Sequence, residues 1–256
     1  ESTADFLSET TGTPRDLYEV VGLAYRRRFP SAASRSESEA QRPFRFAYWG
    51  NLNPQKGSHV LVSAFRDVVA QLSAPVELHL FGSISGEEFA AQLHRDAEGL
   101  PITFHGRYEA QQLIRAEIDA AVFPVLCFET FSLSLTECFE LRLPSSVSDI
   151  GAMPTRAGRA ALAVPPGDVP ALSAAMVELA SRPDLREELR SQIPPLPPDP
   201  HDHALALVEI YEEARAAPAP VAEGLPERDR WLRFLDGQRA SADAAGRGPR
   251  DPRPPI

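Results

Sequence analysis

The sequence predicts an α/β fold in which a parallel sheet carries helices on both faces. Short apolar segments of three to seven residues alternate along the chain with longer segments that have helical periodicity. The first pair is typical: residues 45–48 are mostly apolar and aromatic, and residues 58–72 repeat apolar side chains at helical spacing. Strands that are separated by helices are joined by crossover connections, so they run parallel and are buried on both faces.

The same alternation continues to residue 214. Strands are expected in six segments, at residues 45–48, 76–81, 102–104, 118–124, 145–148 and 161–164. Helices are expected in seven segments, at residues 58–72, 87–97, 110–115, 133–141, 169–180, 185–191 and 203–214. Residues 193–200 are rich in proline and cannot continue a helix. Ligands of parallel sheets bind at the carboxyl ends of the strands, so a site is expected in the loops that follow them.

Composition narrows the class of protein. The chain has 256 residues, of which 43% are hydrophobic, and a formal net charge of −10, which argues against nucleic acid as the main partner. No apolar run approaches the roughly 20 residues of a membrane span, and the first residues are polar and acidic, unlike a signal peptide. Cys127 and Cys138 lie in apolar context, which favours core packing over a disulfide. We therefore expect a cytoplasmic protein with no membrane span and no nucleic-acid partner.

The most informative segment begins at Glu129 and ends at Glu137. It follows a predicted buried strand and leads into a predicted helix. The first N–H groups of a helix are unpaired and the helix dipole favours an anion there, so this corner suits a phosphate. The two carboxylates would repel a bare anion, and we expect them to accept hydrogen bonds from hydroxyl groups elsewhere on the ligand.

Three segments together resemble one enzyme family. The Glu129 to Glu137 segment resembles the Glu-x7-Glu motif of retaining glycosyltransferases of family 4, which have the GT-B fold. Residues 48–57, Tyr-Trp-Gly-Asn-Leu-Asn-Pro-Gln-Lys-Gly, resemble the Gly-Arg-Leu…Lys-Gly loop of the family. Residues 143–151, Leu-Pro-Ser-Ser-Val-Ser-Asp-Ile-Gly, are similar to its Pro-Val-Val-x-Ser-Asp-x-Gly segment. The resemblance covers roughly residues 45–215.

The resemblance implies a domain organisation. Residues 45–215 would form the Rossmann-like nucleotide-sugar-binding domain, the C-terminal half of a GT-B glycosyltransferase. Residues 1–44 would be the end of the N-terminal acceptor domain and the linker, so the acceptor-binding half is missing from this chain. Residues 216–256 would be a tail rich in Pro, Ala and Arg with one possible helix at 227–238. That helix could dock on the absent half, form part of an ordered tail, or begin a further domain.

The resemblance also implies roles for individual residues. Lys56 and Glu129 would be the catalytic pair, with Lys56 on the phosphates and Glu129 on the donor sugar, while Glu137 would hold the ribose. The donor, a nucleoside-diphosphate sugar, would be bound by Gly50, Asn51, Lys56, Gly82, Arg107, Tyr108, Glu129, Phe131, Ser132, Leu133 and Glu137. Backbone N–H groups of residues 131–133 would face the diphosphate. No cofactor and no metal are expected, because no Asp-x-Asp motif stands in a suitable loop.

Four residues depart from the family pattern. Asn51 replaces the usual Arg and carries no charge, Ser132 and Arg142 replace Gly, and Thr155 replaces Glu. These departures keep open an alternative: a catalytically impaired GT-B-like domain that binds a nucleotide or a partner protein. A GT-B epimerase or phosphatase and a glycosidase with paired carboxylates are further alternatives, and the Glu-x7-Glu spacing and the phosphate corner speak against them.

Two other groups of charged or polar residues are expected to lie outside the site. The run from Arg26 to Arg28 is short and is interpreted as a solvated face. His201 and His203 lack a carboxylate or cysteine partner, so we expect no metal there.

Overall fold

The computed structural model describes residue 8, residues 23–29 and residues 42–216. The chain divides into two compact units, Gly22–Ala206 on one side and Glu1–Val21 with Leu207–Ile256 on the other. Of the second unit only Ser8 and residues 207–216 are described. Most of residues 1–44, predicted as the end of the N-terminal domain and the linker, and the predicted helix at 227–238 lie outside the described residues, and the predicted domain boundaries stay predictions.

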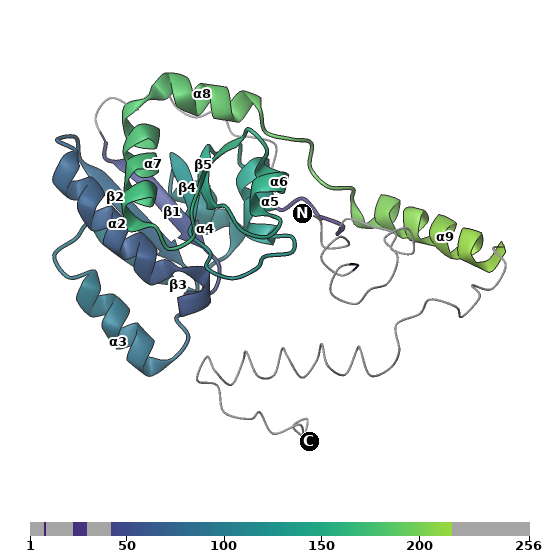
Figure 1. Cartoon of the computed structure of the whole chain (residues 1–256), viewed down its shortest axis with the longest axis horizontal. Helices are drawn as coiled ribbons and strands as arrows, with labels where there is room; N and C mark the ends of the chain where they lie inside the picture. Colours follow the sequence, from purple (N-terminus) through teal and green to yellow (C-terminus); the bar gives the residue numbers. More distant parts are fainter. Residues whose placement is uncertain (1–7, 9–22, 30–41, 217–256) are drawn as a thin grey trace. The chain divides into compact units, whose positions relative to one another are not determined.

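The core of the first unit is a six-stranded parallel sheet (Figure 1). Its strand order is β3-β2-β1-β4-β5-β6, and every pairing between neighbouring strands is parallel. The strands are β1 (Phe44–Trp49), β2 (Val76–Phe81), β3 (Ile102–Gly106), β4 (Ala120–Phe123), β5 (Ser145–Ser148) and β6 (Ala161–Val164). This confirms the predicted Rossmann-like α/β fold, with all six strands where the sequence predicts them.

The helices agree with the sequence to within a few residues. They are α2 (Ser58–Gln71), α3 (Glu87–Asp96), α4 (Ala110–Arg115), α5 (Leu133–Glu140), α6 (Met153–Ala157), α7 (Val169–Ser181), α8 (Pro183–Ser191) and α9 (Pro200–Ala216), with the short 3-10 helix η3 (Pro54–Lys56). The sequence reading missed η3 and α6, which are only three and five residues long. It also began α9 too late: Pro200 is its first residue, a position where the missing N–H of proline costs nothing.

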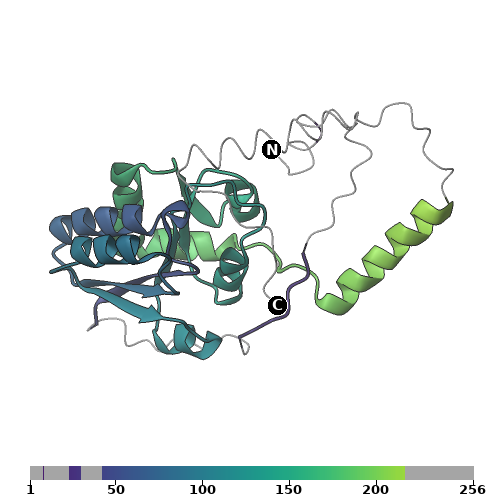
Figure 2. The ribbon, with the colours of Figure 1, turned by 90° about the horizontal axis from the view of Figure 1, so that it is seen from below.

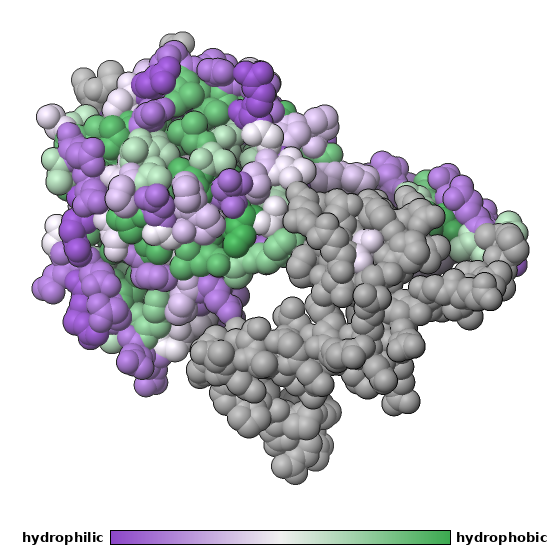
Figure 3. Space-filling model, viewed as in Figure 1, coloured by the Kyte–Doolittle hydropathy of each residue, from purple (hydrophilic) through white to green (hydrophobic). Residues whose placement is uncertain are grey.

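Helices cover both faces of the sheet. Figure 2 shows α2 and α3 on one side of the sheet and α4 on the other. On the α2 side, the buried ring of Phe65 packs edge-on against Phe46 of β1, with ring centroids 6.3 Å apart. Helix α3 is peripheral, because Leu93 is its one fully buried residue, and the surface over it is largely hydrophilic (Figure 3).

The end of α5 explains one departure from the family pattern. Arg142 has a φ of 56°, so a left-handed residue follows the helix even though it is not glycine. The Leu143 amide donates to the Cys138 carbonyl at 3.1 Å and the Arg142 amide donates to the Phe139 carbonyl at 3.0 Å. These two bonds form a Schellman motif, in which glycine is the favoured residue at the left-handed position.

We therefore expect Arg142→Gly to raise the free energy of unfolding by about 1 kcal/mol, the cost of a left-handed conformation for a residue with a Cβ. Urea unfolding measures it. The matched control is Arg115→Gly, because Arg115 is also exposed and stands inside a helix, α4. It should lower the free energy of unfolding by up to about 1 kcal/mol. A loss of stability in Arg142→Gly like that of the control would contradict the strain argument.

Candidate functional site

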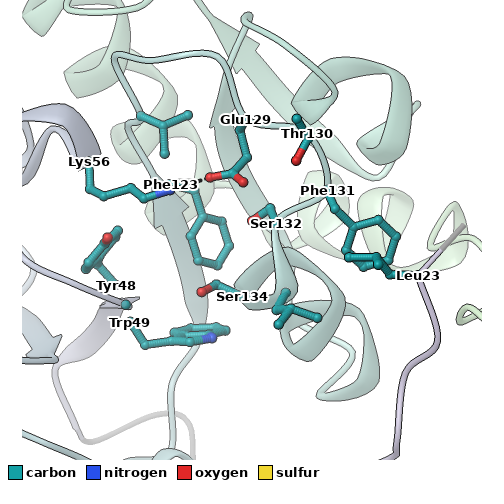
Figure 4. Close-up of a pocket in the computed structure, with 13 residues that line it drawn as sticks. Leu23, Tyr48, Trp49, Lys56, Phe123, Glu129, Thr130, Phe131, Ser132 and Ser134 are labelled. Carbon is teal, nitrogen blue, oxygen red and sulfur yellow. Dashed lines mark hydrogen bonds and ion pairs between the residues drawn. The ribbon is translucent and has the colours of Figure 1, made fainter. Parts of the chain in front are cut away.

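A cavity of about 290 Å³ lies at the carboxyl ends of β1 and β4 (Figure 4). These two strands are neighbours in the centre of the sheet, and the strand order reverses between them. Open parallel sheets bind ligands in the crevice at such a switch point. The lining comes from the end of β1, the end of β4, the loop that follows β4 and the first turn of α5, together with Leu23 and Lys56. It includes Tyr48, Trp49, Gly50, Phe123, Glu129, Phe131, Ser132, Leu133 and Ser134.

Local contacts fix Lys56 at this cavity. The Asn53 side chain caps η3 by accepting from the Lys56 amide at 2.9 Å. The next residue, Gly57, has a φ of 72°, and a Cβ there would lie 1.8 Å from the Pro124 carbonyl oxygen. The Leu126 amide donates to the Gln55 carbonyl at 2.8 Å. The loop after β1 is therefore docked tightly on the loop after β4, and only glycine permits that approach.

Glu129 is held from the opposite side. Its carbonyl accepts from the Ala152 amide at 2.7 Å, and a Cβ on Gly151 would lie 2.5 Å from the same oxygen. The segment that ends in Gly151 thus supports the Glu129 backbone. The Glu129 carboxylate forms an ion pair with Lys56, drawn in Figure 4. Because the pair is neutral overall, the carboxylate does not repel an anion that enters the cavity.

Lys56 is also unusual in the composition. The chain contains 26 basic residues, and Lys56 is the one lysine among them, since the other 25 are arginines. An ammonium is a compact charge, whereas a guanidinium is planar and bulky, and the two are not interchangeable at a packed site. The presence of a single lysine is therefore a further sequence signal for a functional role of Lys56.

The start of α5 closes the cavity. Phe131, Ser132 and Leu133 all line it, as the resemblance implies for a diphosphate-binding corner. Ser132 has a φ of 59° and a ψ of 91°, so it keeps a left-handed conformation where the family usually has glycine. Its hydroxyl oxygen accepts from the Leu135 amide at 3.3 Å and caps the helix.

Arg156 supports this corner and was missed by the sequence reading. Its guanidinium stacks on the Phe131 ring, with Cζ 3.7 Å from the ring centroid. It donates to the carbonyl oxygens of Phe131 and Ser132, the latter at 3.1 Å, and to the Thr136 hydroxyl at 3.0 Å. Burial lowers the pKa of Arg156, and the nearby Glu129 carboxylate opposes that shift.

Glu137 lies behind the cavity rather than in its lining. It is 4% exposed, and its carboxylate accepts a hydrogen bond from the Arg28 guanidinium. Burial raises the pKa of Glu137, while Arg28 and the Trp49 indole act in the opposite direction. The prediction of a solvated face holds in that Arg26, Arg27 and Arg28 are all exposed, but Arg28 also forms an ion pair with Glu137.

The segment that carries Arg28 is anchored by a second carboxylate. Glu140 accepts from the Tyr25 hydroxyl at 2.6 Å and from the backbone amides of Arg28 and Phe29. Burial followed by the Glu137 charge raises the pKa of the neighbouring Tyr108 to about 12. The segment at residues 25–29 is therefore held by two carboxylates of α5, those of Glu137 and Glu140.

The remaining predicted residues do not line the cavity. A Cβ on Gly82 would lie 1.8 Å from the Gly50 carbonyl oxygen, so Gly82 supports the Gly50 loop from behind. Asn51 and Arg107 are exposed. Tyr108 packs edge-on against Phe81, with ring centroids 5.8 Å apart. Their donor-binding roles stay predictions.

The described residues form neither a metal cluster nor a membrane-spanning helix. Within the described part of the chain, no three His, Cys, Asp or Glu side chains come together as a metal site. No described helix is both long enough and apolar enough to cross a membrane. Cys138 is buried and Cys127 is half-buried, and neither forms a disulfide with another described residue.

Comparison with known proteins identifies the family. The model of the family "glycosyl transferases group 1" matches residues 43–182, more than half of the chain. The chain belongs to the group 1 glycosyl transferases. The match ends before α8 and includes all six strands and every residue of the cavity lining except Leu23. No curated protein matches the chain.

Solved structures show the same fold for this group 1 domain. Sucrose-phosphate synthase from Thermosynechococcus elongatus has 24% identity and a TM-score of 0.56, over 70% of this chain and 47% of that one. HepE of Anabaena, solved with UDP and glucose, has 18% identity and a TM-score of 0.57, over 67% of this chain and 48% of HepE. The apo lipopolysaccharide outer core galactosyltransferase WaaB has 17% identity and a TM-score of 0.58, over 79% of this chain and 57% of WaaB. The chain spans about half the length of these GT-B structures.

The ion pair of Arg28 and Glu137 gives a pH-dependent prediction. We expect Arg28→Ala to lower the free energy of unfolding by about 1 kcal/mol at about pH 7, because Arg28 is 44% exposed and solvent screens part of the pair. Burial already raises the folded-state pKa of Glu137, and the substitution raises it further. Below the unfolded pKa, about 4.3, the carboxyl is protonated in both states and the loss disappears.

Urea unfolding of both proteins between about pH 4 and pH 7 measures this difference. The control is Arg27→Ala, since Arg27 is the exposed neighbour. It should change stability little at any pH. An Arg28→Ala loss that is constant across this range would show that the ion pair with Glu137 is not its cause.

Proposed function

We propose that this chain is the donor-binding half of a retaining, metal-independent glycosyltransferase of family 4. The observation that carries the proposal is the cavity at the switch point, where Lys56, Glu129 and the first residues of α5 meet. A cation, a hydroxyl acceptor and unpaired helix amides are what a nucleoside-diphosphate sugar requires. The related HepE was solved with UDP-glucose, which supports a nucleotide sugar as donor. The acceptor would be bound by a domain that is not part of this chain.

The residues of the cavity suggest how transfer proceeds. Lys56 and the N-terminus of α5 stabilise the charge that develops on the leaving diphosphate. Glu129 accepts hydrogen bonds from hydroxyls of the donor sugar and orients it. In a retaining reaction a phosphate oxygen of the donor takes the acceptor proton on the face that the leaving group vacates. Positive charge at the diphosphate comes from side chains and the helix, which is why we propose that no metal is needed.

A second candidate is a domain that binds the nucleotide without efficient transfer. Asn51 is exposed and uncharged, so it provides no counterpart of the arginine usual at this position. Thr155 is exposed as well, where the family usually has a carboxylate. A domain of this kind would bind UDP or another nucleotide and leave the sugar donor intact. A measurement of donor turnover therefore distinguishes the two candidates, whereas a measurement of nucleotide binding does not.

The first test is binding without metal. We expect one of UDP, GDP and ADP to bind the wild-type chain in calorimetry with EDTA present. Lys56→Ala should weaken it by about 10- to 100-fold, the range of a charge-assisted hydrogen bond. Lys56→Arg should not restore it, because the Gly57 approach to the β4 loop leaves a packed site.

Failure of all three nucleotides to bind, or binding that requires a divalent ion, would refute the proposal. Because Lys56 is the single lysine, amine-selective reductive methylation followed by mass spectrometry gives an independent readout. A bound nucleotide should protect it.

The two carboxylates are expected to serve different parts of the donor. Glu137→Gln should weaken the nucleoside diphosphate and its glucose ester alike, by roughly tenfold, because we assign Glu137 to the ribose. Glu129→Gln should weaken binding of the nucleotide sugar only. Because this substitution frees Lys56 from its ion pair, the variant should bind the nucleoside diphosphate at least as tightly as the wild type does. The measurement is four dissociation constants for the two variants and two ligands. Equal losses for both ligands in both variants would contradict the assignment.

A further inference from the structure

We propose that Arg156 is a positioning residue of the diphosphate site: it clamps two successive carbonyl oxygens so that the Ser132 and Leu133 amides face the cavity. This inference rests on the proposed function and extends it to a residue that neither the Glu-x7-Glu motif nor the Lys-Gly loop contains.

The geometry of the clamp follows from the planar trans peptide. Nη1 of Arg156 donates to the carbonyl oxygens of Phe131 and of Ser132. In a trans peptide the N–H of the next residue points opposite to the carbonyl. The N–H groups of Ser132 and Leu133 therefore point away from Arg156, and both residues line the cavity. Two successive amides directed at one point form an anion-binding nest.

Arg156 is itself held by two further contacts. Its guanidinium stacks on the Phe131 ring at 3.7 Å and donates to the Thr136 hydroxyl at 3.0 Å, so one side chain contacts both the loop before α5 and α5 itself. Ser132 lies between the two clamped carbonyls in a left-handed conformation that a residue with a Cβ adopts at a cost. Arg156 supplies the hydrogen bonds that offset this cost.

Charge gives a second reason for an arginine here. Lys56 is paired with Glu129 and Asn51 is uncharged, so the loop after β1 brings a single cation to the cavity. The half charge of the α5 N-terminus is then reinforced by the guanidinium that lies against it. The guanidinium therefore adds to the positive potential at the start of α5.

The test uses inorganic pyrophosphate, which needs no knowledge of the base, together with UDP, GDP and ADP. Calorimetry should show that Arg156→Ala weakens pyrophosphate and the bound nucleotide by a similar factor, about tenfold. Arg156→Lys should lose about as much, because an ammonium cannot stack on Phe131 and clamp two carbonyls. The control is Arg159→Ala, the same change of charge three positions away at an 80% exposed side chain. It should leave both affinities unchanged.

The outcomes separate the inference from the proposed function. If the wild-type chain binds none of these ligands, the proposed function fails and the inference fails with it. If it binds and Arg156→Ala binds equally, the inference alone is refuted. Full affinity in Arg156→Lys would also refute it, because charge rather than positioning would then suffice. Should Arg156→Ala fail to fold by circular dichroism, Phe131→Leu removes the stacking alone and must weaken pyrophosphate for the inference to hold.

Discussion

The close docking of two loops is the constraint on which the site depends. Gly57 sits against the Pro124 carbonyl so tightly that a Cβ would overlap it, and the Leu126 amide bonds to the Gln55 carbonyl. This contact joins the exits of β1 and β4, the two strands that flank the switch point of the sheet. Lys56 and Glu129 meet because of it, since each belongs to one of the two loops. The cavity therefore depends on the pairing of β1 with β4 in the sheet and on the glycine at position 57.

Buried charge organises the second half of the site. Glu137 is nearly inaccessible, and a carboxylate in that position requires a partner. Arg28 supplies it from the segment that precedes the sheet, which Glu140 anchors through the Tyr25 hydroxyl and backbone amides. A ribose held by Glu137 would share the carboxylate with Arg28. With the ribose role that we propose for Glu137, nucleotide binding would be linked to the position of the segment at residues 23–29.

The sequence predicted the fold almost completely, because apolar periodicity is a local property. All six strands were placed correctly, and β2, α4, β5 and β6 agree residue by residue. The short η3 and α6 were missed because three or five residues hold too little pattern. Lys56, Glu129 and the start of α5 were predicted as one site from the motifs. Arg28 and Arg156 were not, because their contacts span 109 and 24 residues of sequence and leave no local trace.

The departures from the family pattern fall into two physical classes. Ser132 and Arg142 have a positive φ, the conformation that favours glycine, so their effect is a conformational cost. Asn51 and Thr155 are exposed and remove charge, leaving the backbone of the two docked loops in place. Arg156 adds a half-buried cation at the same corner, bonded to the carbonyls of Phe131 and Ser132. The site thus combines Lys56, in the loop after β1, with a second cation at the start of α5.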